Sequence, residues 1–162
     1  MIEIVLIVIF IALVFDFLNG FHDSANSIAT IVSTQVLTPQ KAVLFAAFFN
    51  FIAAFTFDVA VAKTIGKGLV DITDIDAWVL TGGLLGAIFW NLFTWYFGLP
   101  VSSSHALIGG YGGAAVMKLG WGVLILPGWI KVIAFIVLAP AIGLVLGVIN
   151  MYVTTWIVKD MK

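Results

Sequence analysis

Two clusters of small polar residues interrupt an otherwise apolar sequence, and their side chains are suited to binding a charged ligand. They are His22-Asp23-Ser24-Ala25-Asn26-Ser27 and Ser102-Ser103-Ser104-His105. A Gly or Pro precedes each cluster and an apolar run follows it, which predicts that each cluster starts a new helix. A helix start exposes unpaired N–H groups and the positive end of the helix dipole. Two such starts aimed at one point would form an oxyanion site, with serine hydroxyls and the Asn26 amide as further donors.

The candidate substrate-binding residues come from both clusters. They are His22, Asp23, Asn26, Ser102, Ser103, Ser104 and His105. For the two histidines the alternatives are a hydrogen bond to the anion, proton relay, or a bond to a neighbouring helix. For the serines and Asn26 the alternative is that they only cap helices at the water interface.

Asp23 conflicts with a simple anion site, because a carboxylate repels phosphate or sulfate unless a cation or a proton accompanies it. An Asp embedded in a membrane is costly and usually functional. We therefore expect coupling to a cation: Asp23 and Asn26 are the candidate Na⁺ ligands, and Asp23 is the candidate H⁺ carrier. Asp16 and Asn91 are further candidate cation ligands, and the alternative for Asp16 is an interfacial position.

Two other polar residues lie in apolar sequence. Asn50 is expected either to face the site or to bond a neighbouring helix, and Asp58 is expected at the membrane interface.

The composition predicts an integral membrane protein. Of 162 residues, 63% are hydrophobic and 9% are charged, whereas a soluble domain carries about 25% charged residues. The net charge of −1 gives no basic footprint for nucleic acid. The absence of cysteine excludes disulfides and thiolate metal sites, and no cofactor is expected.

The elements that must position these residues are five apolar stretches, of which all but 106–117 are about long enough to span a membrane. The stretches are residues 2–18, 42–62, 77–97, 106–117 and 129–158. We expect an all-α membrane protein with about four full transmembrane helices plus two short or broken helices, in one transmembrane domain over residues 1–162. The first break is expected at Asn19-Gly20, and residues 63–76 are expected to form a polar connecting loop. The run Thr38-Pro39-Gln40-Lys41 is expected to be a turn followed by a helix start. The seven lysines are spread over several connections and do not fix the orientation.

Three glycine pairs have the spacing that lets membrane helices pack closely. The pairs are Gly82/Gly86, Gly109/Gly113 and Gly143/Gly147. Pro140 lies in the last apolar stretch, where a tilt or a kink would accommodate a length greater than one bilayer needs.

The two clusters and their flanks resemble a known family. The run Asn19-Gly20-Phe21-His22-Asp23-Ser24-Ala25-Asn26-Ser27-Ile28-Ala29-Thr30 resembles the signature of the PiT-type inorganic phosphate transporters. The run Trp90-Asn91-Leu92-Phe93-Thr94-Trp95-Tyr96-Phe97-Gly98-Leu99-Pro100, followed by Val101-Ser102-Ser103-Ser104-His105, is similar to that family's second motif.

The resemblance implies symport of inorganic phosphate with Na⁺ or H⁺, by alternating access between two inverted repeats, in the plasma (inner) membrane of a prokaryote. Asp23 and Asn26 match the family's essential Asp and Asn, and residues 102–104 match its Ser/Thr run. His22 stands where many Na⁺-coupled members have Asn, as in the bacterial proton-coupled permeases. Asn50 lies where some animal members carry Glu. The family also includes sulfate carriers, so another oxyanion is an alternative substrate.

The chain resembles only one of the family's two repeats. Three readings follow: a fragment, half of a split transporter whose second repeat is a separate chain, or an antiparallel homodimer. We expect the chain to work only as a pair. Competing functions are a non-transporting membrane subunit and an intramembrane hydrolase that uses a serine of 102–104 with a histidine. The hydrolase is disfavoured because no Gly-x-Ser-x-Gly elbow is present.

Overall fold

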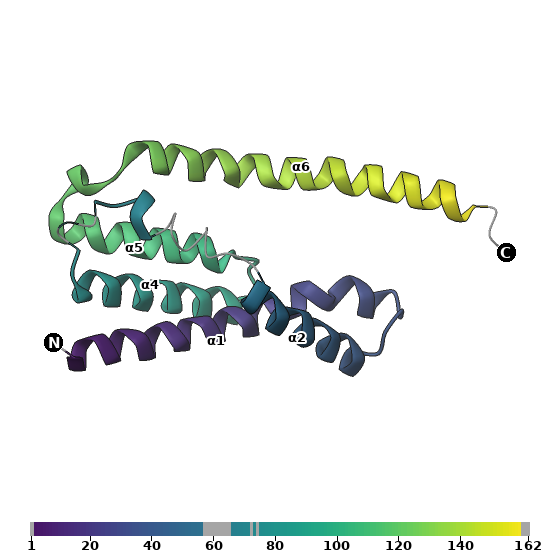
Figure 1. The fold of residues 1–162 in the computed structure, drawn as a ribbon, viewed down its shortest axis with the longest axis horizontal. Coiled ribbons are helices and arrows are strands. Elements are labelled where there is room, and N and C mark those ends of the chain that lie inside the picture. The colour runs from purple at the N-terminus through teal and green to yellow at the C-terminus, as the bar shows by residue number, and fades with distance from the viewer. Residues whose placement is uncertain (1, 57–65, 72, 74, 160–162) are drawn as a thin grey trace. The chain divides into compact units, whose positions relative to one another are not determined.

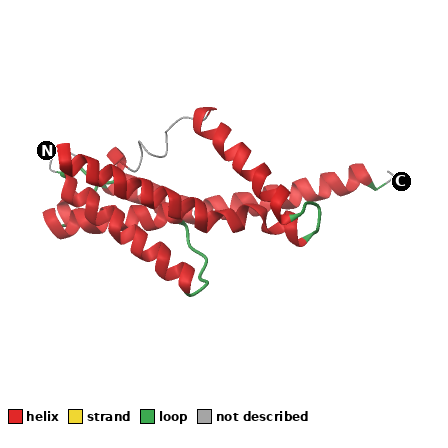
Figure 2. Ribbon diagram, turned by 90° about the horizontal axis from the view of Figure 1, so that it is seen from below, coloured by secondary structure: helices red, strands yellow, loops and turns green. Residues whose placement is uncertain are grey.

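The computed structural model describes residues 2–56, 66–71, 73 and 75–159, and their regular elements are helices (Figures 1 and 2). In chain order these are α1 (Ile2–Ser33), α2 (Pro39–Thr56), α4 (Ala77–Tyr96), α5 (Ser103–Leu119), the 3₁₀ turn η2 (Trp121–Val123) and α6 (Leu126–Val158). Among the described residues, α1, α2, α4 and α6 are long and apolar enough to cross a membrane. The predicted all-α membrane class is therefore confirmed. Helix α5, with 17 residues, is the short helix expected after the second cluster.

The break expected at Asn19-Gly20 is wrong, because α1 continues through it to Ser33. One glycine costs a helix only about 1 kcal/mol, which the long apolar flanks tolerate. The two serines of the polar cluster are satisfied inside the helix: the Ser24 hydroxyl donates to the Phe21 carbonyl at 2.9 Å and the Ser27 hydroxyl donates to the Asp23 carbonyl at 3.1 Å. The piece expected to be a separate short helix is therefore the C-terminal part of α1.

Helix α1 ends in a Schellman motif at Gln35. Gln35 has a left-handed φ of 59°, and the Val36 and Gln35 N–H groups donate to the carbonyls of Ile31 and Val32. The chain then reverses, and α2 starts at Pro39 as predicted, so that α1 and α2 contact each other. The predicted end of this span and Asp58 lie outside the described residues.

Helices α4 and α5 pack most closely at two glycines. A Cβ added to Gly83 would lie 2.9 Å from the Cα of Tyr111, and one added to Gly110 would collide with the Gly83 carbonyl oxygen. Of the predicted pairs, Gly82 and Gly86 do face α5. The other two pairs, at 109/113 and 143/147, meet nothing within 4 Å among the described residues, so α5 uses the glycine next to the predicted one.

The end of the α4–α5 pair near Asp76 is fastened by polar contacts. The Asp76 carboxylate accepts from the Val79 N–H at 3.2 Å as the N-cap of α4, and it pairs with Lys118 of α5 at 2.5 Å. Within the predicted 63–76 connection, Leu69 and Val70 are fully buried, and Val70 bridges to Leu124. This connection therefore contributes apolar side chains to the core as well as polar ones.

Helix α6 makes up most of a second compact unit, Ile125–Lys162. It is one helix of 33 residues that continues through Pro140, and none of its residues is buried. At 1.5 Å per residue it is about 50 Å long, more than a hydrocarbon core of about 30 Å requires. Lys159 lies 5.5 Å from the Trp156 ring centroid, an arrangement suited to a membrane interface.

Gly110→Ala is predicted to destabilise the chain by about 1–3 kcal/mol, because the added methyl must push the α4 backbone away. The matched control is Gly109→Ala, one residue along α5, where a Cβ meets nothing within 4 Å. Unfolding by SDS titration in mixed micelles, followed by helical circular dichroism, measures the difference. Equal stability of the two variants would contradict the close contact of α4 and α5 at Gly83 and Gly110.

The Asp76–Lys118 pair predicts a specific pH dependence. The hydrogen bond from Lys118, and then that from the Val79 N–H, lower the pKa of Asp76 below its ordinary 3.8. Because the folded-state pKa is the lower one, the stabilisation is present above the ordinary pKa and is lost as the pH falls through the folded value. The thermal midpoint should fall more for the wild type than for Asp76→Asn between about pH 5 and about pH 3. Lys118→Met should reduce the pH dependence similarly, and an unchanged dependence in both variants would rule the pair out.

Candidate functional site

The second cluster forms a helix start, as predicted. Helix α4 ends at Tyr96, Gly98 turns the chain with φ of 64°, and α5 begins at Ser103. The Ser102 hydroxyl oxygen accepts from the His105 N–H at 3.4 Å and so caps α5. Ser103 is 3% exposed, and its hydroxyl has no hydrogen-bond partner among the described residues. Ser104 and His105 are exposed. One helix N-terminus with an unused buried hydroxyl is therefore available to an anion.

The first cluster is placed differently, because its residues lie within α1 and offer no helix start. The expectation of two opposed helix N-termini is therefore wrong, since the helix continues through the expected break. Asp23 is partly buried, Asn26 is exposed, and Asp16 is exposed one helical heptad before Asp23. These side chains can contribute carboxylate and amide groups, but not backbone N–H groups.

His22 and Asn91 lie together between α1 and α4. Asn91 is 2% exposed, and both its amide nitrogen and its amide oxygen lack partners among the described residues. The His22 Nδ1 is likewise buried without a partner there. Both residues line a cavity of about 10 Å³, near the minimum size for one water molecule. The Phe21 and Trp95 rings, 5.5 Å apart, also lie at this contact.

The close contact between Gly83 and Gly110 places Asn91 and Ser103 at about the same height along the α4–α5 pair. The contact of Asp76 with Lys118 shows that α4 and α5 run antiparallel. Asn91 lies eight residues after Gly83, and Ser103 lies seven residues before Gly110. At 1.5 Å per residue, Asn91 lies about 12 Å along α4 from Gly83 and Ser103 lies about 11 Å along α5 from Gly110. Because the helices are antiparallel, both lie on the same side of the glycine contact. Three buried polar groups without partners, on α1, α4 and α5, are thus gathered by adjacent helices.

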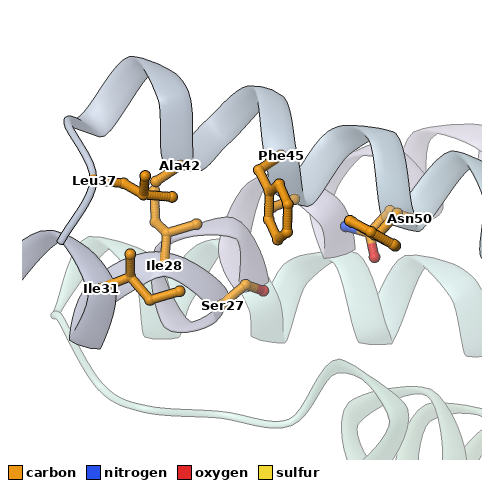
Figure 3. Close-up of a pocket in the computed structure, with 9 residues that line it drawn as sticks. Ser27, Ile28, Ile31, Leu37, Ala42, Phe45 and Asn50 are labelled. Atoms are coloured by element: carbon orange, nitrogen blue, oxygen red, sulfur yellow. The ribbon is translucent and has the colours of Figure 1, made fainter. Parts of the chain in front are cut away.

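A larger cavity of about 260 Å³ lies between α1 and α2 (Figure 3). Its walls are mostly apolar, and its polar lining comes from Ser27 and Asn50. Figure 3 shows these two side chains toward one end of the cavity, away from Leu37 and Ala42. Asn50 therefore lines the space between α2 and α1.

Sequence reasoning did not single out Thr94, which is 2% exposed. Its hydroxyl donates to the carbonyls of Trp90 and Asn91, at 2.8 and 3.1 Å. This side chain is satisfied within its own helix, so it differs from Asn91. A mid-helix Thr in an apolar run is a weak signal, and only the structure separates these two polar residues.

Comparison with known proteins identifies relatives over most of the chain. The sequence model of the phosphate transporter family matches residues 19–162. A probable low-affinity inorganic phosphate transporter of Rhizobium meliloti is 52% identical over 91% of this chain and 44% of the relative. One of Bacillus subtilis is 48% identical over 96% of this chain and 47% of the relative. A solved structure of a sodium-dependent phosphate transporter superposes with a TM-score of 0.87 at 27% identity, covering 95% of this chain and 40% of that one.

These comparisons confirm the family resemblance and the integral membrane assignment, and the named relatives are bacterial, as expected for a prokaryotic inner-membrane protein. The chain spans less than half the length of these relatives. This share of the relatives' length fits one of the two repeats that the family resemblance implies.

Asn91→Leu is predicted to leave the thermal midpoint unchanged or to raise it. The substitution replaces a buried amide without partners by an apolar group of similar size, which removes a desolvation cost. Asn91→Ala is the control, since it removes the amide but leaves a void, and it should be less stable than Asn91→Leu. Differential scanning fluorimetry in detergent measures both. A loss above about 2 kcal/mol in Asn91→Leu would mean that the amide holds the fold together.

Proposed function

This chain belongs to the phosphate transporter family, and we propose that it carries inorganic phosphate across the membrane with a coupling cation, acting by alternating access with a second repeat or a second copy. The observation that carries the proposal is the group of buried polar atoms on His22, Asn91 and Ser103, which have no partners among the described residues. A membrane protein retains such atoms at a cost of stability. A polar ligand that reaches them during transport accounts for their retention.

Phosphate fits the donors that the chain offers. The start of α5 presents backbone N–H groups, the Ser103 hydroxyl and the positive end of the helix dipole. His22, Asn26, Ser102, Ser104 and His105 are the further proposed substrate-binding residues. The bacterial relatives are named as probable inorganic phosphate transporters, which favours phosphate over sulfate as the substrate.

The cation is proposed from charge balance. Asp23 adds a negative charge near a dianionic or monoanionic substrate, and a cation on Asp23 and Asn26 removes the repulsion. Asp16 and Asn91 are the further proposed cation ligands. The similar solved structure is that of a sodium-dependent transporter, which favours Na⁺, whereas His22, at a position where many Na⁺-coupled members have Asn, favours H⁺. Each net positive charge that moves inward contributes about 2.3 kcal/mol of driving force per 100 mV of membrane potential.

Asp23→Asn is predicted to abolish coupled phosphate uptake while leaving the protein folded in the membrane. The assay is uptake of labelled phosphate into proteoliposomes, with an imposed Na⁺ gradient in one arm and a pH gradient in the other. Asp71→Asn is the matched control, because Asp71 lies outside the helices and its carboxylate accepts from the Thr73 hydroxyl. Uptake that survives in Asp23→Asn would remove Asp23 from the mechanism. Uptake of sulfate but not phosphate would redirect the proposal to the other oxyanion.

A further inference from the structure

Two aromatic rings form part of the wall of the cavity that holds His22 and Asn91. The Phe21 ring of α1 and the Trp95 ring of α4 have centroids 5.5 Å apart and are inclined by 58°, and both line the cavity. Phe21 and Trp95 are 50% and 52% exposed, whereas Asn91 is 2% exposed. The ring pair therefore borders the cavity on one side and the outside of the α1–α4 contact on the other. Both helices belong to the unit Met1–Leu124, so this contact is defined without reference to α6.

The cavity is too small for the substrate under the proposed function. Its volume of about 10 Å³ is near the minimum for one water molecule, and a phosphate ion is larger than a water molecule. The structure therefore has the cavity closed to phosphate. For phosphate to contact the His22 Nδ1 or the Asn91 amide, part of the wall must move.

The ring pair is the part of the wall that can move with the least loss of contact. Among the described residues, Phe21 and Trp95 each have only the other as an aromatic neighbour, whereas Phe93 of α4 contacts three rings. Turning one ring aside therefore breaks a single ring contact. It also widens the cavity more than turning a leucine would, because the two rings are larger than the leucines that line it.

We propose that Phe21 and Trp95 form an aromatic gate over the cavity: the rings close it in this structure, and outward rotation of one ring admits inorganic phosphate to His22 and Asn91. This inference rests on the proposed function for the claim that phosphate must reach the cavity. It explains how two polar residues can be kept from solvent in one state and meet a polar ligand in another, since opening requires only a shift between two side-chain arrangements.

The test uses thiol labelling, because the chain contains no cysteine and N91C therefore gives a single reporter inside the cavity. The reagent is sulfonatoethyl methanethiosulfonate, an anion that is larger than water, applied in lipid nanodiscs where it reaches both membrane faces. N91C alone should react slowly. F21A/N91C and N91C/W95A should react several-fold faster, up to about tenfold, because loss of one ring contact raises the open fraction by that factor.

The matched control is F17A/N91C, which should react as slowly as N91C. Phe17 is a phenylalanine one helical turn before Phe21, and it does not line the cavity. Equal reaction rates in the control and in the two ring variants would overturn the gate, and so would no reaction in any of them.

A lock provides a second measurement that does not rely on truncated rings. In F21C/W95C, a short bifunctional thiol reagent should stop the uptake of labelled phosphate into proteoliposomes, and a reductant should restore it. The same treatment should leave each single-cysteine variant at its untreated rate, and full uptake by the locked protein would overturn the gate. Faster labelling of the ring variants in a chain that takes up no phosphate would support the gate and reject the proposed function.

Discussion

The contact between Gly83 and Gly110 is the constraint from which the arrangement of α4 and α5 follows. With no Cβ at either position, the two backbones approach within van der Waals distance. About two helical turns to one side lies the Asp76–Lys118 pair, and about two turns to the other side lie Asn91 and Ser103. The glycine contact and the Asp76–Lys118 ion pair therefore fix α4 and α5 to each other at two points. These two points determine the height at which α5 starts relative to Asn91. Without that fixed level, Ser103 and Asn91 would not be held at one depth.

Polar side chains within the helices differ in whether their own helix satisfies their hydrogen bonds. Thr94 and Ser27 lie on the same helices as Asn91 and Asp23, yet their hydroxyls donate to backbone carbonyls one turn away. Such a side chain is satisfied within its own helix. Asn91 has two polar atoms in a fixed amide plane and no partner among the described residues, so it adds nothing to the helix that holds it. Residue type alone does not separate these two cases, whereas the hydrogen-bond partners of each side chain do.

The sequence was sufficient for the membrane class, for the helix start at Pro39 and for a helix start at the second cluster, because composition, Pro and a Ser cap act locally. It failed at Asn19-Gly20, where local polarity predicted a break, whereas the hydroxyls of Ser24 and Ser27 are satisfied by backbone carbonyls within a continuous helix. Glycine spacing predicted that α4 meets α5, but the register that selects Gly110 over Gly109 depends on both helices together. The joint burial of His22 and Asn91 was beyond local reasoning for the same reason, since 69 residues separate them.

The unbroken α1 alters what the first cluster can contribute. A helix start binds an anion through backbone N–H groups that are already unpaired, whereas the middle of a helix has none to offer. The residues of the first cluster must therefore act through side chains, and those of Asp23 and Asn26 are a carboxylate and an amide. Carboxylates and amide oxygens suit a cation better than an anion. The proposed function therefore divides the two charges between elements: the cation is proposed at the middle of α1 and the anion at the start of α5.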